Sequence, residues 1–164
     1  MTAVPPPGES RLLIHGTTVA MGHVAAVLRG PSGSGKSDLA LRFLAGAWPD
    51  GHRARALVSD DQTMLTRVDG RLIASAPSTI AGKLEVRGLG IVGVAAATNA
   101  EVRLVVDLVP ASAIERMPDP AASIHLLGHA VRLRCLCPFE PSAPLKLALL
   151  LRAATDAELP PRCE

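Results

Sequence analysis

The alternation of hydrophobic and polar positions along the chain predicts more strands than helices. Short apolar or alternating runs of strand length recur over most of the sequence. The predicted strands cover residues 11–14, 17–21, 23–28, 56–59, 64–68, 71–74, 83–87, 102–109, 123–127 and 130–136. Apolar residues at helical spacing are found in 36–47 and 143–158. Because the segment between these two helices offers almost no further helix, we expect an α/β fold of the α+β kind, built on a mixed, largely antiparallel sheet.

Two short turns organise the predicted hairpins. Asp69-Gly70 separates two alternating segments, and this dipeptide is the strongest short-range hairpin signal. Gly128-His129 is expected to join the last two strands in the same way. Because side chains alternate along a strand, the second strand of this pair is expected to direct Val131, Leu133 and Cys135 inward.

The two predicted helices have recognisable ends. The first is expected to stop before the turn cluster Pro49-Asp50-Gly51. Ser142 precedes the second as a candidate N-cap, and Pro144 lies in its first turn. The apolar face of this last helix is expected from Leu145, Leu149, Leu150 and Ala153.

The segment between the apolar run 23–28 and the first helix reads G-x-x-x-x-G-K-S, the phosphate-binding P-loop. It consists of Gly30, Pro31, Ser32, Gly33, Ser34, Gly35, Lys36 and Ser37. The order strand, glycine-rich turn, helix is the context that the motif requires, because the exposed N–H groups and the helix N-terminus then attract phosphate. Lys36 is expected to reach the β- and γ-phosphate oxygens, and the Ser37 hydroxyl is expected to bind Mg²⁺.

Composition excludes several classes of function. The net charge is +2, from 17 basic and 15 acidic residues, which is too balanced to favour nucleic-acid or membrane binding. Aromatic residues make up only 2%, too few for a platform that stacks single-stranded nucleic acid. No apolar run reaches the roughly 18 residues of a membrane span, and the N-terminus has no signal-peptide pattern, so a cytoplasmic location is expected.

Length and cysteine content favour a single intracellular domain. We expect a disordered tail over 1–10, one catalytic domain over 11–158 and a short tail over 159–164. Cys135 and Cys137 are too close for an ordinary disulfide and lack a second Cys/His pair of suitable spacing for zinc. Free thiols are therefore the favoured interpretation of these cysteines.

Phosphoryl transfer also requires oxygen ligands for a metal and a group that accepts a proton. Asp60 and Asp61 follow the strand 56–59, and neighbours in an extended strand point in opposite directions. One carboxylate is therefore a candidate for the metal and the other for the acceptor, although acidic residues are also common where strands simply end in a turn. Glu85 is a candidate metal ligand or a solvated strand residue, and His15 is an active-site candidate or a structural histidine.

These motifs together resemble the catalytic domain of HPr kinase/phosphorylase. The resemblance rests on His15-Gly16, the P-loop, the segment from Gly51-His52-Arg53 to Asp60-Asp61, and the stretch E-V-R-G-L-G-I over 85–91. The last stretch is highly particular to that family. The match covers roughly residues 13–109, and the short chain resembles the truncated form found in some proteobacteria, a catalytic domain without the N-terminal domain.

The resemblance implies a phosphoenolpyruvate-carboxykinase-like fold and ATP-dependent phosphorylation of a serine in HPr, a small phosphocarrier of the sugar phosphotransferase system. It also implies removal of that phosphate by inorganic phosphate, with release of pyrophosphate, and a homo-oligomer, since the family forms hexamers. By their match to the family's motifs, His15 and Lys36 are expected to be catalytic and Asp61 to be the general base. Ser37 and Glu85 match its Mg²⁺ ligands, and we add Asp60 to that set.

Some positions depart from the family pattern. Asp38 replaces the glutamate that usually follows the P-loop serine, and the family's loop arginine is expected at Arg116. Where the family carries a P-V-R-P-G-R stretch linked to dephosphorylation, the sequence here reads P-F-E-P-S-A over 138–143, with no arginine. We therefore expect kinase activity to dominate. A kinase of a small metabolite and a non-catalytic ATP-binding regulatory module are the alternative functions.

Overall fold

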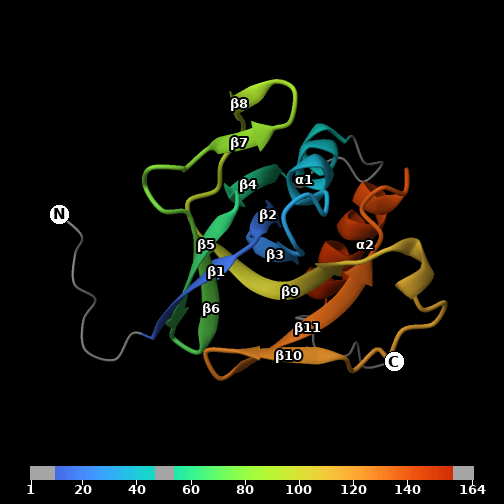
Figure 1. Cartoon of the computed structure of the whole chain (residues 1–164). Coiled ribbons are helices and arrows are strands. Elements are labelled where there is room, and N and C mark those ends of the chain that lie inside the picture. Colours follow the sequence, from blue (N-terminus) through green and yellow to red (C-terminus); the bar gives the residue numbers. More distant parts are fainter. Residues whose placement is uncertain (1–9, 47–53, 157–164) are drawn as a thin grey trace.

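The computed structural model describes residues 10–46 and 54–156 (Figure 1). The expected tails over 1–10 and 159–164 lie outside these residues, apart from Ser10. The strands are β1 Arg11–His15, β2 Thr17–Met21, β3 Val24–Arg29, β4 Arg55–Ser59, β5 Gln62–Val68, β6 Arg71–Ser75, β7 Lys83–Val86, β8 Gly90–Gly93, β9 Ala100–Leu108, β10 Ser123–Leu126 and β11 His129–Leu136. The helices are α1 Lys36–Ala45, the short 3₁₀ helix η1 Ala111–Ala113, and α2 Ala143–Asp156.

Within the described residues, nine strands form one curled sheet, and β7 and β8 form a separate hairpin. The main order is β1-β5-β6-β9-β3-β2-β4, and β11, paired with β10, joins β9 as well. The P-loop strand β3 runs parallel to β9 and antiparallel to β2. The β9–β11 pair is also parallel, and the remaining pairs are antiparallel. The predicted mixed, largely antiparallel sheet is therefore confirmed.

The centre of the sheet is buried on both faces. On β3, Val24, Ala26 and Leu28 belong to the core beneath the helices, whereas Ala25 and Val27 belong to a second core on the opposite face. Figure 1 shows α1 and α2 on one side of this centre and the curled strands β1, β5 and β6 on the other. A strand covered on both faces reads as a continuous apolar run, which explains the sequence pattern before the P-loop.

The β5–β6 turn has the predicted form, and the β10–β11 turn differs by one residue. Asp69 and Gly70 have φ values of 48° and 74°, as a two-residue type I′ turn requires. In the second hairpin the residues with positive φ are Leu127 and Gly128, at 50° and 72°. The turn is therefore Leu127-Gly128 and not Gly128-His129, because glycine takes the second turn position and His129 already belongs to β11.

The predicted apolar face of α2 is wrong except at Leu150, which is partly buried and packs against the core. Leu145 and Leu149 are exposed, and the residues that pack into the core are Ala143, Leu147, Ala148, Leu151 and Ala154. This stripe faces α1, β2, β3 and β9. Because most positions of this helix are Leu or Ala, more than one stripe satisfies helical periodicity, and packing against α1 and the sheet selects between them.

Cys135 was expected to point inward and is instead exposed: Val131 and Leu133 on the same face of β11 pack into the second core, but Cys135 does not. Cys135 and Cys137 are both free thiols, as the sequence favours. Among the described helices, none is long and apolar enough to cross a membrane.

Candidate active site

The P-loop lies between the end of β3 and the start of α1. The Lys36 ammonium crosses the loop and donates hydrogen bonds to the carbonyl oxygens of Gly30, at 2.7 Å, and Pro31, at 3.0 Å. Arg29, directly before the loop, forms two hydrogen bonds of 2.8 and 2.9 Å with Asp107 of β9. The loop is therefore anchored where its strand ends.

Two of the loop glycines are required by their surroundings. A Cβ on Gly30 would lie 2.4 Å from the Ser34 hydroxyl oxygen and 3.0 Å from the Ser34 Cβ, so Ser34 would have to move. Gly35, the N-cap of α1, has a φ of 89°, and a Cβ there would lie 3.1 Å from the ring of Phe139. Glycine adopts such positive φ values without the steric cost that other residues pay.

Asp60 is a buried carboxylate that joins four elements. Only 7% of the residue is exposed. Its Oδ1 accepts hydrogen bonds from the hydroxyls of Thr17, at 2.8 Å, and Ser37, at 2.9 Å. Its Oδ2 accepts one from the backbone N–H of Glu85, at 3.0 Å. The end of β4 is thereby tied to β2, to the first turn of α1 and to β7.

Asp61 faces the opposite way and is exposed. Its Oδ1 lies 3.2 Å from Nδ1 of His15, and its backbone carbonyl accepts a hydrogen bond of 2.8 Å from the N–H of Gly16. Asp61 has a φ of 64°, a left-handed conformation that aspartate tolerates better than most residues. The expectation that the two neighbouring carboxylates have different surroundings is confirmed: one is fixed within the protein, and the other is accessible beside a histidine.

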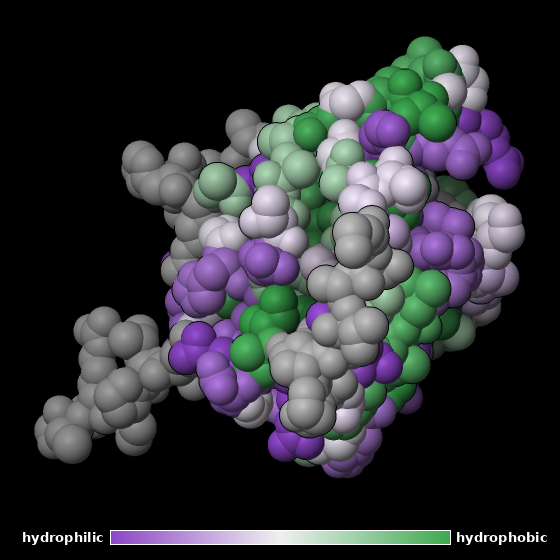
Figure 2. All heavy atoms as spheres, turned by 90° about the vertical axis from the view of Figure 1, so that its left-hand side faces the viewer, coloured by the Kyte–Doolittle hydropathy of each residue, from purple (hydrophilic) through white to green (hydrophobic). Residues whose placement is uncertain are grey.

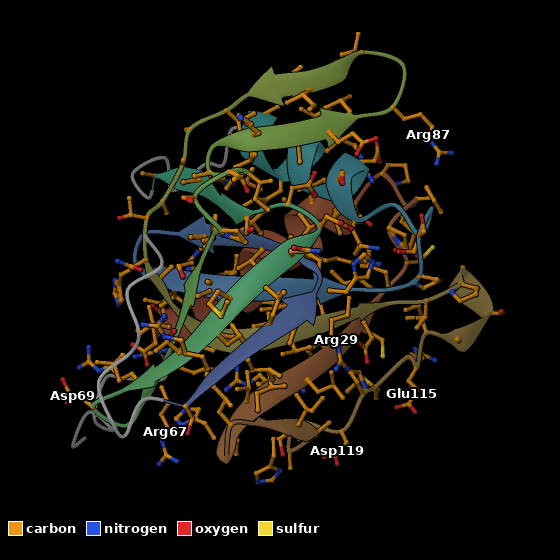
Figure 3. The ribbon with its side chains drawn as sticks, turned by 60° about the vertical axis from the view of Figure 1, so that its left-hand side comes forward. Arg29, Arg67, Asp69, Arg87, Glu115 and Asp119 are labelled. Atoms are coloured by element: carbon orange, nitrogen blue, oxygen red, sulfur yellow. The ribbon has the colours of Figure 1, made fainter. Side chains whose placement is uncertain are left out.

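These groups line one open cleft of about 600 Å³. Its floor is the P-loop, and β7 contributes Glu85, Val86 and Arg87 to its wall. Figure 3 shows Arg87 extending from the hairpin end of β7. The acidic side chains that line the cleft are Asp38, Asp60, Asp61 and Glu85, against the two cations Lys36 and Arg87. The acidic side chains would repel the phosphates of a nucleoside triphosphate. A divalent cation bound with the nucleotide would offset this repulsion, so we expect the cleft to bind phosphate together with such a cation.

The oxygen groups in the cleft fit Mg²⁺. In the described residues, no group of three or more His, Cys, Asp or Glu side chains is arranged to hold a metal by itself. Mg²⁺ does not require such a cage, because it usually takes one or two carboxylates and completes its octahedron with water and substrate phosphates. Ser37, Asp60 and Glu85 supply one hydroxyl and two carboxylates at the cleft.

Arg116 stands apart from the other predicted site residues. It is exposed on the loop between η1 and β10 and is not among the residues that line the cleft. Its neighbour Glu115 lies in Figure 3 on this loop, below Arg29 at the end of the P-loop strand. The structure therefore brings together His15, Asp61, Glu85, Asp60 and the P-loop, and leaves Arg116 outside.

Sequence reasoning missed Thr17 and Phe139 as contributors to the site. Thr17 is fully buried and bonds Asp60, 43 positions away. Phe139 lines the cleft from the segment after β11. The one signal for Phe139 was its place in the stretch P-F-E-P-S-A, which departs from the family pattern. For Thr17 the sequence offers no signal, because a threonine in an apolar strand is common.

The chain matches known proteins over most of its length. Residues 9–150 match the family model described as HPr Serine kinase C-terminal domain. An HPr kinase/phosphorylase of Xanthomonas campestris is 33% identical over 159 residues, covering 88% of this chain and 47% of the relative. One from Clostridium tetani is 42% identical over 86 residues, covering 52% and 25%. The chain thus spans half or less of these relatives.

A solved structure, described as the Hpr(Ser) kinase/phosphatase from Coxiella burnetii, has the same fold. It superposes with a TM-score of 0.72 at 25% sequence identity, covering 88% of this chain and 96% of that one. The family model spans the P-loop, both acidic residues at the end of β4, and Glu85. The chain therefore belongs to the family of the HPr serine kinase C-terminal domain.

Proposed function

We propose that this chain is a cytoplasmic, ATP-dependent serine kinase that acts on the phosphocarrier protein HPr. The observation that carries the proposal is the meeting of three groups in one cleft: the P-loop with Lys36, the buried Asp60 bonded to Ser37, and the exposed Asp61 beside His15. The names of the matching proteins support HPr as the acceptor.

The two aspartates suit different tasks. Asp60 lines the cleft, but its two oxygens already accept hydrogen bonds from Thr17, Ser37 and the Glu85 N–H, so its carboxylate is held in place. Asp61 is exposed, and its carboxylate contacts the imidazole of His15. A general base must lie within hydrogen-bond reach of the proton that it accepts. Asp61 is therefore assigned to accept the proton of the serine hydroxyl, with His15 orienting its carboxylate.

The remaining groups bind and neutralise the phosphates. The N–H groups of the P-loop and the N-terminus of α1 hold the phosphate oxygens, and the Lys36 ammonium neutralises charge that develops on the transferred group. Ser37, Asp60 and Glu85 are the residues that would hold Mg²⁺. When bound, the ion would supply neutralisation of phosphate charge.

The test is transfer of phosphate from Mg-ATP to purified HPr, with the modified residue located by mass spectrometry. We expect phosphate on one HPr serine. Asp61→Asn is expected to reduce the rate by about 10²–10⁴-fold, the usual contribution of a general base. Asp69→Asn is the matched control, because Asp69 also has positive φ but lies in the β5–β6 turn, at the opposite end of Figure 3 from Arg87.

Each outcome has a distinct meaning. Phosphate on serine that is lost in Asp61→Asn but kept in Asp69→Asn supports the kinase and its base together. Phosphate found only on a small molecule would indicate a metabolite kinase. Nucleotide binding without transfer to any acceptor would indicate a regulatory module. Either of the last two results would overturn the proposed acceptor.

We further propose that phosphorylation is faster than phosphorolytic dephosphorylation in this chain. The segment 138–143, next to the P-loop, contains Glu140 and no arginine, and the Glu140 carboxylate is paired with Lys146. No cation from this segment is thus available to bind the attacking inorganic phosphate. Single-turnover rates measured in both directions check the proposal, and equal rates would contradict it.

A further inference from the structure

Phe139 is an aromatic ring held at the mouth of the phosphate cleft. It is 69% exposed and lines the same cleft as Gly35, Lys36 and Asp38. Phe43, the other phenylalanine of the sequence, is completely buried in the core. The ring lies against the start of α1, since a Cβ added to Gly35 would be 3.1 Å from two of its ring atoms.

The backbone on both sides of Phe139 is fixed to α1. The Arg42 guanidinium donates hydrogen bonds to the carbonyl of Pro138 and, at 3.4 Å, to the carbonyl of Glu140. The same guanidinium donates to the Asp38 carboxylate at 2.9 Å. Pro138 is buried, and the Glu140 carboxylate is bonded to Lys146 of α2. The backbone that carries the exposed ring is therefore held in place. Little backbone conformational entropy then remains to be lost when the ring binds a ligand.

The chemistry of the cleft favours a position for the nucleoside away from the acceptor. In phosphoryl transfer the attacking and leaving oxygens are roughly in line, so the nucleoside must leave the P-loop away from the acceptor. The acceptor groups His15 and Asp61 are anchored at the β1–β2 corner, whereas Phe139 is anchored to α1. Among the described residues that line the cleft, only Phe139 is aromatic.

We propose that Phe139 is the base-stacking residue of the nucleotide site, with its ring packed against the purine base of ATP. The inference rests on the proposed function for the identity of the nucleotide. Stacking recognises the face of a base, which every purine offers, and desolvates both rings. In this assignment the P-loop binds the phosphates, and Phe139 supplies the affinity that distinguishes a nucleotide from bare polyphosphate.

The test compares ligands with and without a base. Dissociation constants are measured by calorimetry for Mg-ATP and for Mg-tripolyphosphate, with the unaltered protein, Phe139→Ala and Phe139→Trp. We expect Phe139→Ala to weaken Mg-ATP about tenfold or more, the usual effect of removing a stacked aromatic, and to leave tripolyphosphate within about twofold. Phe139→Trp is expected to retain the affinity for Mg-ATP, because it keeps an aromatic face.

Two results would overturn the inference. An equal loss for both ligands would mean that Phe139 acts by shaping Gly35 and the P-loop. Unchanged binding of Mg-ATP would place the base elsewhere. Leu149→Ala, which removes an exposed apolar side chain of α2, is the control and is expected to change neither constant. If the unaltered protein binds Mg-ATP but transfers no phosphate to HPr, the proposed function is wrong. The stacking role of Phe139 is still tested by the dissociation constants of its variants.

Discussion

At the scale of single residues, the hydrogen bonds of Asp60 explain why two adjacent carboxylates differ. Three donors from three elements converge on Asp60, and each replaces water that burial has removed. Asp61, one residue later, has turned into a left-handed backbone conformation and faces solvent. A single change of backbone direction thus separates a fixed carboxylate from an accessible one.

Thr17 is the donor to Asp60 that can be removed with little change of shape. We expect Thr17→Val to lower the free energy of unfolding by about 1–2 kcal/mol, because one hydrogen bond to a buried charged group is lost. The carboxylate is also freed to move, so the affinity for Mn²⁺ in the presence of nucleotide is expected to fall. Urea denaturation and Mn²⁺ titration measure the two effects.

Thr66→Val is the matched control for this substitution, since Thr66 lies on β5 within the same sheet and is half-buried. It is expected to change the stability by no more than about 0.5 kcal/mol. If Thr17→Val and Thr66→Val are equally mild in both measurements, the hydroxyl of Thr17 has no role in positioning Asp60.

The same residues show what sequence alone can and cannot predict about the site. The P-loop could be predicted because its eight residues are contiguous and their chemistry is local. Asp60 and Asp61 could be proposed from alternation along a strand end, although in the structure the left-handed backbone of Asp61 separates their side chains. The link from Thr17 to Asp60 could not be predicted, since the register between β2 and β4 places the two side chains together.

At the scale of elements, local signals predicted the turns better than the helix faces. Asp69-Gly70 specifies its own turn, because both residues accept positive φ. The glycines at 88 and 90 are not explained by a close approach of another segment, because a Cβ on either one would meet nothing within 4 Å. Their φ values of 88° and 91° are the reason for glycine there.

The two faces of α2 provide a direct test of the observed packing. Leu151 is 0% exposed and Leu149 is 48% exposed, two positions apart on one helix. We expect Leu151→Ala to cost about 2–5 kcal/mol of unfolding free energy, from lost burial and the cavity that remains. Leu149→Ala is expected to cost no more than about 0.5 kcal/mol. A larger loss at Leu149 in chemical denaturation would mean that this face is covered in solution, as in the homo-oligomer expected from the family.

Glu101 and Arg103 form an ion pair on β9 that makes the stability depend on pH, and Arg103 also reaches α2. Arg103 donates to the Glu101 carboxylate at 3.1 Å and to the Ala154 carbonyl at 3.4 Å. The hydrogen bond from Arg103 lowers the pKa of Glu101 below its ordinary 4.5, although burial opposes the shift. A lowered pKa in the folded state means that the pair stabilises the fold above pH 4.5 and that this contribution is lost as the pH falls further.

We therefore expect Glu101→Gln to reduce the free energy of unfolding by about 1–2 kcal/mol near neutral pH. The difference from the unaltered protein is expected to disappear as the pH falls below 4.5, where Glu101 becomes protonated. Glu115→Gln, which changes an exposed side chain on the loop after β9 (Figure 3), is the control. A difference that is constant from neutral to acidic pH would show that the ion pair does not contribute through its charge.

At the scale of the whole molecule, the sheet serves as a rigid platform, and the cleft lies at the carboxyl end of its inner strand β3. Hydrophobic cores cover both faces of β3 and β9, so the P-loop projects from the best-packed strands. The β7–β8 hairpin, in contrast, extends beyond the platform with Leu89 and Ile91 exposed (Figures 1 and 2). Figure 2 shows hydrophobic side chains gathered at this upper end of the molecule. The cleft thus lies between the P-loop, which follows a well-packed strand, and the β7–β8 hairpin, which is less well packed.

Because the cleft is assembled from several separate segments, its ligand should stabilise the entire fold. A ligand that binds only the folded state adds about 2.7 kcal/mol at a hundredfold excess over its dissociation constant, which for a domain of this size raises Tm by about 5–10 °C. We expect this shift with Mg-ATP and expect Lys36→Met to abolish it. Arg67→Met, which removes a cation near the β5–β6 turn, should retain it (Figure 3). A shift that persists in Lys36→Met would place the nucleotide outside the P-loop. If ATP raises Tm equally with and without magnesium, the cleft binds phosphate without a divalent cation despite its acidic residues.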